Sequence, residues 1–361
     1  MAKFTEIFED VTKQGAKIPT NLYLENGLYP IIDQGQSQVA GYTNETEGLF
    51  TDIPAIIFGD HTRIIKYVDT PCFLGADGVK LLKAKDPTAN YKYLYYALCN
   101  ADIPNTGYNR HFKWLKEIEI AECSIEEQNS IVTQFEKIDT LICLRKQQLS
   151  KLDELVKSRF IELFGSQCHN EKHYPYGKID DVAEIYLGLT HTPEYIETGV
   201  KFISAKNTSC DYLDLSDVKY ISREEYASAP AGAKPRKGDV LFSRVGSNLG
   251  HPVILDIDEE LCTFVSLGYL RTKGSITNLY LKHWMRDDFF AEQVRRKVVG
   301  GGQPNLNTGW LKEFRIIIPP LDLQQQFAAF VEQTDKSKLA IQQSLEKLET
   351  LKKALMQKYF G

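Results

Sequence analysis

The sequence predicts an α+β fold in which two mixed α/β globular segments are separated by two long helices, which pair as an antiparallel coiled coil. Three observations support this prediction. A segment from the middle of the chain is repeated at its end, each copy carries a heptad pattern of apolar residues, and a β-rich segment precedes each copy. A repeat of this kind predicts two equivalent units related by approximate, or pseudo-two-fold, symmetry.

The repeat begins at the segment Trp114-Leu115-Lys116-Glu117, which returns as Trp310-Leu311-Lys312-Glu313, 196 residues later. The same offset then holds without a gap to Phe164-Gly165 and Phe360-Gly361. About sixteen of some fifty positions are identical in constant register, which is too many for chance in a chain of mixed composition. The repeat divides the chain into four segments, alternately globular and helical: residues 1–112, 113–165, 166–308 and 309–361.

The first helical segment has an apolar residue every seven positions, which is the heptad pattern of a coiled coil. Ser124 and Glu127 form a capping box, so the helix is expected to begin near Ile125, and Gly165 is a stop signal. A helix of about forty residues is about 60 Å long. Its apolar seam is formed by Phe135, Ile138, Ile142, Leu149, Leu152, Val156 and Leu163.

The second long helix is expected to follow Pro319-Pro320, because proline cannot lie inside a helix, and to end at Gly361. Neither helix can bury its apolar stripe alone, so we expect the two to pack together, antiparallel in view of the repeat. The seam of the second helix is formed by Phe327, Val331, Ile341, Leu345, Leu348, Leu355 and Tyr359.

The two globular segments share little sequence identity, but their predicted elements come in the same order. Each has a β-rich stretch, a second strand, a helix rich in Tyr and Leu, and an Asn-containing loop before the Trp-Leu-Lys-Glu motif. The pattern is typical of mixed α/β segments, and the tyrosines of the first helix are expected in the core. These stretches are residues 55–61, 64–68 and 91–99 in the first segment, and 238–244, 252–256 and 278–299 in the second.

The composition is that of an ordinary globular protein, with 361 residues, 43% hydrophobic and 25% charged. No apolar run approaches the length needed to span a bilayer, and the first residues lack a secretory signal. Seven cysteines lie singly, without a Cys-x-x-Cys pair, which favours reduced thiols in a cytoplasm over disulfides or a zinc site. The net charge of −5 does not indicate a nucleic-acid-binding protein, although local basic clusters decide phosphate binding.

Motifs typical of enzymes are missing from the sequence. An adenine-N6 methyltransferase needs an Asn/Asp-Pro-Pro-aromatic motif, whereas Pro319-Pro320 stands between Ile318 and Leu321. There is no P-loop and no His-Glu-x-x-His spacing, and Gly300-Gly301-Gly302 follows a predicted helix rather than opening one. Asp60-His61 is more readily a structural or binding element than an acid–base pair. We therefore predict no catalytic residue and no metal site.

Three segments resemble parts of one known family. Residues 108–116 resemble the junction between a recognition domain and a helical region. Ile316-Ile317-Ile318-Pro319-Pro320-Leu321, followed by Gln324, resembles the start of a second helical region, and residues 237–246 resemble a strand–loop element. Over essentially the whole chain, the arrangement is similar to the specificity (S) subunit of type I restriction-modification systems. The first copy departs from the family pattern, because Cys123-Ser124-Ile125 stands where prolines are usual.

This resemblance implies a non-catalytic subunit that gives a methyltransferase/endonuclease complex its DNA sequence specificity. Each globular segment would be a target-recognition domain that reads one half of a bipartite double-stranded DNA target. The helices would set the spacer between the halves and recruit two methyltransferase (M) subunits, and restriction (R) subunits could join them. S-adenosylmethionine, ATP and Mg are expected only on these partner subunits, and the chain itself is expected to hold no cofactor.

Candidate DNA contacts follow from the chemistry of base edges and phosphates. Arg suits guanine, Asn or Gln suits adenine, and Lys, Arg or exposed amides suit phosphates. Clusters of such residues lie in predicted loops at matching points of both globular segments. In the first segment they are Gln36, Asp60, His61, Arg63, Asn109, Arg110, His111 and Lys113, with Gln34 and Ser37 nearby. In the second they are Lys206, Asn207, Arg244, Ser247, Asn248, Gln303, Asn305 and Asn307.

A further basic cluster, Arg295-Arg296-Lys297, ends a predicted helix and is explained as well by the helix dipole. Two other functions also stay open on the sequence. A coiled-coil adaptor or scaffold would bind protein partners without DNA sequence specificity, so binding that requires a bipartite sequence separates it from an S subunit. A DNA-modifying enzyme is the third interpretation, and the missing motifs argue against it.

Overall fold

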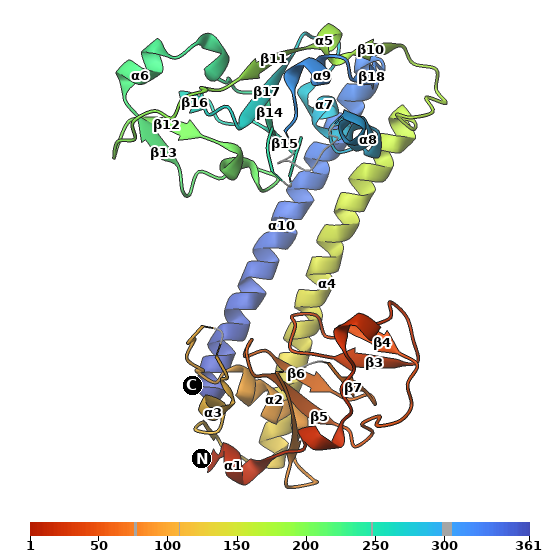
Figure 1. Ribbon diagram of the computed structural model, residues 1–361, viewed down its shortest axis with the longest axis vertical. Helices are drawn as coiled ribbons and strands as arrows, with labels where there is room; N and C mark the ends of the chain where they lie inside the picture. Colours follow the sequence, from red (N-terminus) through yellow and green to blue (C-terminus); the bar gives the residue numbers. More distant parts are fainter. Residues whose placement is uncertain (76–77, 108, 247, 298–304) are drawn as a thin grey trace. The chain divides into compact units, whose positions relative to one another are not determined.

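The computed structural model of the chain describes residues 1–75, 78–107, 109–246, 248–297 and 305–361. Its contacts divide the chain into two compact units. Unit 1 comprises residues 1–147 and 341–361, and unit 2 comprises residues 148–340. Each unit therefore contains one globular segment and a part of each long helix (Figure 1). Where each recognition domain ends along the chain stays a prediction.

Unit 1 contains two small sheets and a strand pair. The antiparallel four-stranded sheet has the order β2 (Phe8–Asp10), β8 (Val79–Ala84), β5 (Ala55–Gly59) and β6 (Ile65–Val68). The three-stranded sheet has the order β4 (Gly41–Thr43), β3 (Tyr29–Ile32) and β7 (Phe73–Leu74). The remaining elements are β1 (Ala2–Lys3), β9 (Glu119–Ile120), α1 (Phe4–Ile7), α2 (Tyr91–Cys99), α3 (Phe112–Leu115), and the 3₁₀ turns η1 (Thr12–Gln14) and η2 (Thr20–Leu22).

Unit 2 repeats this topology strand by strand. Its four-stranded sheet has the order β11 (Ala183–Leu187), β17 (Leu267–Thr272), β14 (Val240–Ser243) and β15 (Pro252–Ile254). Its three-stranded sheet has the order β13 (Lys219–Ile221), β12 (Val200–Ile203) and β16 (Leu261–Thr263). The other counterparts are β10 (Tyr176–Lys178), β18 (Arg315–Ile317), α5 (Ile179–Val182), α7 (Asn278–Trp284) and α9 (Thr308–Lys312). The matching order of elements predicted from the sequence is confirmed.

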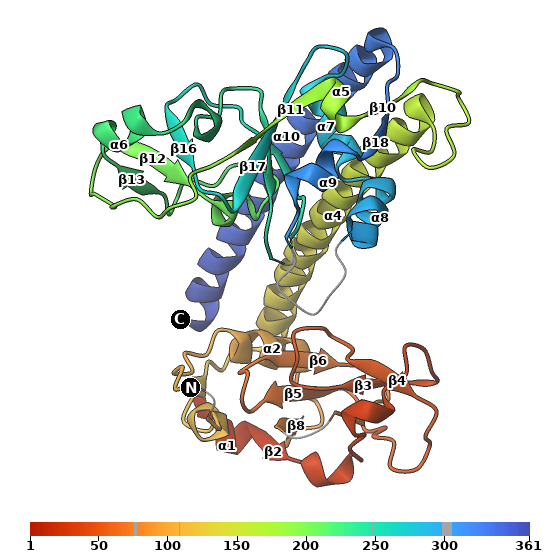
Figure 2. The same cartoon turned by 45° about the horizontal axis from the view of Figure 1, so that its top comes forward.

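Both units stack three layers, with the four-stranded sheet in the middle. On the central strand β5, Ile56 and Phe58 pack with the tyrosines of α2, whereas Ala55 and Ile57 pack with Ile32 of the other sheet. Because successive side chains of a strand point to opposite faces, a strand covered on both faces is apolar throughout. Figure 2 shows α2 alongside β5 and β6. The tyrosines of α2 therefore belong mostly to the core, as predicted.

The helix predicted over residues 278–299 is wrong in one respect, because it is two helices, α7 and α8 (Asp288–Lys297). The chain turns between them at Asp287, whose Oδ1 accepts the backbone N–H of Phe289 at 2.9 Å. An Asp side chain in this role satisfies a donor that the first turn leaves unpaired, so it starts a new helix. α8, α6 (Arg223–Ser228), and the 3₁₀ turns η3 (Ala205–Thr208) and η4 (Ala231–Ala233) complete unit 2.

The two long helices begin and end where the sequence predicts. α4 (Ile125–Phe164) and α10 (Leu321–Phe360) have 40 residues each. The Ser124 hydroxyl accepts the N–H of Glu127 at 3.2 Å. Gly165 follows α4 with a φ of +72°, a left-handed conformation that favours glycine. In α10, Gln324 is fully buried and ties the first turn to the segment before the helix, since its Nε2 donates to Pro319 O at 2.9 Å.

Within each unit the parts of α4 and α10 run antiparallel, as predicted (Figure 1). In unit 1, Lys352 donates to Asp139 at 2.5 Å. In unit 2, Lys338 donates to Asp153 at 2.5 Å. The seam is fully buried where aromatic residues meet, at Phe135 in unit 1 and at Phe327 in unit 2. Apolar burial of this kind contributes about 1.5–3 kcal/mol for each large side chain.

Candidate nucleic-acid interface

Three loops of unit 1 meet at the end of β5. Gln34 lies in the loop after β3, and its Oε1 accepts the N–H of His61 at 3.2 Å, while its carbonyl accepts the Thr62 hydroxyl at 2.7 Å. The ring Nδ1 of His61 lies 3.2 Å from the carbonyl oxygen of Asn109, in the loop before α3. Loop residues that are far apart in the sequence, including His61 and Asn109, are thus brought together by the fold.

Two of the predicted contact residues in unit 1 lie in the interior. Asp60 is 4% exposed and His111 is fully buried. Asp60 Oδ1 accepts the N–H of Phe112 at 2.7 Å, and the Asp60 carbonyl oxygen lies 2.9 Å from Nδ1 of His111. These bonds fasten the end of β5 to the loop before α3. In this arrangement both side chains position the loop rather than present a group to a ligand.

The other predicted residues of unit 1 lie at or near the surface. Arg63 is half-buried, and its Nη1 donates to the carbonyl oxygen of Ile103 at 3.0 Å. His61 is also half-buried. The exposed members of the set, which can present amide or cationic groups to DNA, are Gln36, Asn109, Arg110 and Lys113.

The sequence prediction missed a buried lysine that holds one of these loops. The side chain of Lys66, on β6, is 3% exposed, and its Nζ donates to Ser37 O at 2.5 Å and lies 3.4 Å from Asp33. Burial lowers the pKa of Lys66, while Asp33 acts in the opposite direction. The signal was present in the strand pattern, because Lys66 alternates with Tyr67 and so shares the buried face of Val68.

In unit 2, Arg244 lies directly after β14 and ties three loops together. Its guanidinium donates to the carbonyl oxygens of Val265 at 2.9 Å and Leu306 at 3.3 Å, and to Oδ1 of Asn305 at 3.5 Å. Burial lowers the pKa of Arg244. The sequence prediction assigned Arg244 to base reading, and the structure adds a positioning role for the same side chain.

The remaining predicted residues of unit 2 divide by exposure. Asn207 is buried, and its amide bonds to Ser204 N at 3.0 Å and Asp214 O at 2.9 Å. Lys206 is exposed and paired with Asp217. Asn248, Asn305 and Asn307 are exposed, although Asn307 also caps α9. Ser247 and Gln303 lie outside the described residues, and Arg295, Arg296 and Lys297 occupy the last turn of α8.

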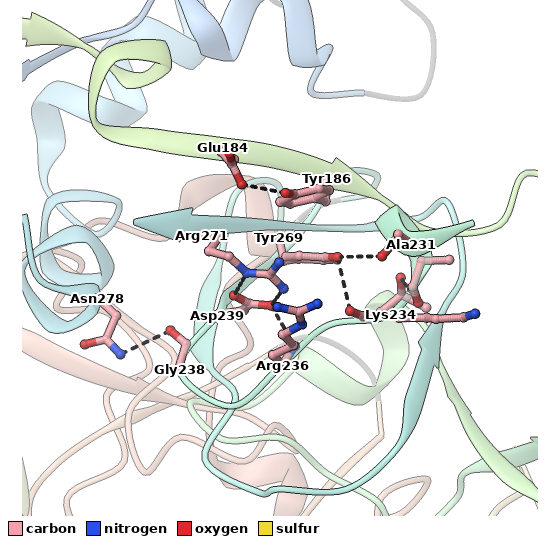
Figure 3. A network of polar contacts seen from close by, with 12 residues as sticks. Glu184, Tyr186, Ala231, Lys234, Arg236, Gly238, Asp239, Tyr269, Arg271 and Asn278 are labelled. Carbon is pink, nitrogen blue, oxygen red and sulfur yellow. Dashed lines mark hydrogen bonds and ion pairs between the residues drawn. The ribbon is translucent and has the colours of Figure 1, made fainter. Parts of the chain in front are cut away.

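A polar network fixes the start of β14, within the segment Lys237-Gly238-Asp239 (Figure 3). Asp239 is 3% exposed and accepts two bonds from Arg271, at 2.9 Å from Nε and 2.7 Å from Nη2. The Arg271 guanidinium also lies 5.0 Å from the ring centre of Tyr186. The hydrogen bonds with Asp239 raise the pKa of Arg271. This carboxylate therefore has a structural role in unit 2.

Across the part of the chain that the structure describes, no three His, Cys, Asp or Glu side chains are grouped so that they could hold a metal ion. Within the same described residues, no helix is both long and apolar enough to cross a membrane. The polar groups that gather instead are amides, imidazoles and guanidinium groups on loops. Such groups recognise a ligand by hydrogen bonds and charge.

Two α/β units of one topology, each with polar loops gathered at the end of its central strand, define a duplicated binding protein. Comparison with known proteins identifies the family of this binding protein. The sequence model of the type I restriction modification DNA specificity domain matches residues 1–154 and 171–352. The chain belongs to this family of DNA specificity proteins.

The chain is similar to individual members over most of its length. It is 22% identical over 314 residues to the type I restriction enzyme MjaVIII specificity subunit of Methanocaldococcus jannaschii, covering 79% of this chain and 74% of that protein. It is 21% identical to the EcoR124I/EcoR124II specificity subunit of Escherichia coli, covering 87% and 81%. The crystal structure of an S subunit from M. genitalium shares the fold, with a TM-score of 0.59 at 16% identity, over 99% of this chain and 95% of that one.

Proposed function

We propose that this chain is the DNA specificity subunit of a type I restriction-modification complex, and that each unit reads one half of a bipartite target. The observation that carries the proposal is the duplicated topology, in which the loops after β5 and after β14 occupy equivalent places. Two similar scaffolds with different loop residues are suited to reading two different short sequences. Direct readout needs such side chains at base edges, and exposed Asn, Gln and Arg residues supply them.

In this proposal the chain has no catalytic activity, and its named loop residues contact DNA. It recruits two methyltransferase subunits, and the helices α4 and α10 set the number of base pairs between the half-sites. S-adenosylmethionine, ATP and Mg are bound by partner subunits, with restriction subunits as further partners. The proposed location is the cytoplasm, which the seven free cysteines favour. An adaptor without DNA specificity is disfavoured by membership of the DNA specificity family.

The test is a methylome comparison of hybrid subunits. The chain is expressed with its methyltransferase subunit in a host without other adenine methylation, and the methylated motif is mapped by sequencing. Residues 1–112 are then replaced by the corresponding segment of a relative with a known target. We expect one half of the bipartite motif to change completely while the other half and the spacer stay the same.

The matched control replaces residues 166–308 instead, which should change only the other half. The purified chain without partners should transfer no methyl group. A motif in which both halves change together would contradict the assignment of one unit to one half-site. Methylation that depends on no sequence would favour the adaptor.

A further inference from the structure

Unit 1 contains an open cavity between α2, the strand pair β1–β9 and the start of α4. Its volume is about 440 Å³, and pockets for small ligands usually measure about 300–1,000 Å³. None of the residues that line it is among the proposed DNA contacts. The apolar part of the lining consists mostly of small side chains, among them Ala2, Ala84, Ala89 and Ala121.

The equivalent place in unit 2 is built from larger apolar residues. The hydroxyl of Tyr93 donates to Ala121 O at 2.8 Å, and the hydroxyl of Tyr280 donates to Ile317 O at 2.7 Å. Ala121 and Ile317 are therefore equivalent, and they are also related by the repeat offset of 196. Ile317 is fully buried.

Two further positions of the cavity differ in the same direction. Ala89 stands directly before the N-cap of α2, and Ile276, which is 2% exposed, stands directly before the N-cap of α7. Ile318 lies against Gly177 of β10, where an added Cβ would meet its Cδ1 at 2.7 Å. The counterpart of Ile318 at the repeat offset is Glu122. Unit 2 therefore fills with its own isoleucines the place that unit 1 leaves open.

This exchange of large for small residues has no cause in the backbone, since both units have the same sheet topology. Burying large apolar side chains stabilises a fold, and their replacement by alanine leaves a cavity at a cost in stability. A ligand that occupies the cavity of unit 1 restores the lost contacts.

The cavity also carries charge of one sign. Within the described chain, its lining includes the carboxylates of Glu6, Asp86 and Glu122 but no lysine or arginine. Hydrogen bonds from Thr88 lower the pKa of Asp86, which keeps this carboxylate ionised at neutral pH. Glu122 accepts from the amino group of Met1 at 3.1 Å, but both groups are exposed. An exposed pair of this kind is weak, so an ammonium group of a ligand can replace it.

We propose that this cavity binds a small aliphatic polyamine, with its methylene chain against the alanines and its ammonium groups at Glu6, Asp86 and Glu122. Methylene groups gain by leaving water, and ammonium groups gain by approaching carboxylates. Among the described residues these carboxylates are not grouped closely enough to hold a metal ion, whereas a polyamine carries its charges along a chain. A phosphate or nucleotide would be repelled by three carboxylates.

The test is calorimetric binding of spermidine to the full-length chain. Three comparison probes separate the contributions: pentanediol has a methylene chain without charge, magnesium chloride at matched ionic strength has charge without a chain, and the peptide Ala-Lys-Ala presents one lysine side chain. Hydrogen exchange of amides in α2 and β8 locates the site and checks that each variant is folded.

The variants alter the shape and the charge of the cavity separately. Ala89→Ile and Ala121→Ile place in unit 1 the residues that unit 2 has. Asp86→Asn and Glu122→Gln keep the shape and remove one charge each. Glu117→Gln is the matched control, because Glu117 is also an exposed carboxylate of unit 1 but does not line the cavity.

Spermidine is expected to bind the parent chain and Glu117→Gln with equal affinity and to slow exchange in α2. Each isoleucine variant should weaken binding at least about tenfold, and each charge variant about two- to fivefold. A parent chain without saturable spermidine binding would overturn the inference, as would tighter binding of magnesium or of the lysine peptide. Parental affinity in the isoleucine variants would place the polyamine elsewhere. If those variants fail to fold, parental affinity in both charge variants overturns the inference instead.

Discussion

Unit 1 and unit 2 use the same backbone junction with opposite side-chain chemistry. At the end of the central strand, Asp60 N donates to Gly78 O at 2.7 Å, and Arg244 N donates to Ser266 O at 2.9 Å. The Asp60 carboxylate accepts from the first residue of α3, whereas the Arg244 guanidinium donates to the loop before α9. An acceptor and a donor thus fasten the same junction. The backbone arrangement is kept, and the residues that carry it are free to change.

The two units also differ at the other end of the central sheet, where a prediction can measure the difference. Register places Lys83 of β8 and Arg271 of β17 at equivalent points. Lys83 bonds to Asp52, which is 66% exposed, whereas Arg271 makes two bonds to Asp239, which is 3% exposed. If the cation is removed, water can therefore take its place at the exposed Asp52, whereas the buried Asp239 would be left unpaired.

We expect Arg271→Ala to lower the free energy of unfolding of unit 2 by about 3–5 kcal/mol, because it leaves a buried carboxylate unpaired. Lys83→Ala should lower that of unit 1 by about 1 kcal/mol, as for an exposed pair. Hydrogen exchange of amides in β14 and β5 of the full chain measures the two units separately. Arg271→Lys serves as the control, since it keeps the charge but loses the second bond. Equal losses in both units would show that burial of the partner is not the deciding factor.

Features that depend on neighbouring residues could be predicted from the sequence, whereas features that depend on distant loops could not. The long helices were predicted within a residue because their capping signals and heptads are local. The strand pattern could place Lys66 on a buried face, but the partners of Lys66 and Arg244 could not be predicted from the sequence, since both are supplied by loops that are distant in the chain. The turn at Asp287 was missed because an apolar pattern continues across it. DNA contact by the exposed loop residues stays a prediction.

The second prediction asks whether the Asp60 and Arg244 junctions serve recognition independently. Asp60→Ala should weaken binding to the half-site read by unit 1, and Arg244→Ala should weaken binding to the half-site read by unit 2. Each loss is expected to be about 1–3 kcal/mol, because each variant frees a recognition loop. DNA binding is measured on duplexes altered in one half-site at a time. If Arg244 only positions its loop, affinity falls with base preference unchanged. If it also reads a guanine, preference at one base pair relaxes as well.

Asn105→Ala is the control for these two variants, since Asn105 is exposed in the same loop, its side chain accepts from Gly107 N within that loop, and it is not among the proposed DNA contacts. An effect of Asp60→Ala on both half-sites would break the comparison, because it would show that the units do not read DNA independently.

The third comparison concerns α2 and α7, which both follow an N-cap that accepts from the third helical residue, Asn90 in unit 1 and Thr277 in unit 2. Six residues after each cap stand Tyr96 and His283. Tyr96 stacks on Phe135 with ring centres 4.7 Å apart, and His283 meets Phe327 at 4.9 Å. Both rings therefore fill the space between a short helix, α2 or α7, and a long helix, but only the imidazole can gain a proton in mild acid.

Burial lowers the pKa of His283 to about 3, and the nearby cations Arg286, Lys282 and Lys338 act in the same direction. In the unfolded chain the same histidine takes up its proton near pH 6.5. Its neutral form is thus favoured by folding. The stability that comes from burying neutral His283 is fully present above pH 6.5 and is lost as the pH falls from about 6.5 towards 3.

We therefore expect unit 2 to lose up to about 2 kcal/mol more than unit 1 between pH 7 and pH 5. Burial raises the pKa of Tyr96, so that residue does not respond in this range. Hydrogen exchange of α7 and α2 amides at several pH values measures the difference, and His283→Gln should remove it by taking away the titrating group. The carboxylates of both units also titrate in acid, but they are unchanged in this variant. If His283→Gln and the parent chain lose stability in parallel, the acid response of unit 2 comes from its carboxylates, and the exchange of tyrosine for histidine between the two helices has no consequence for stability.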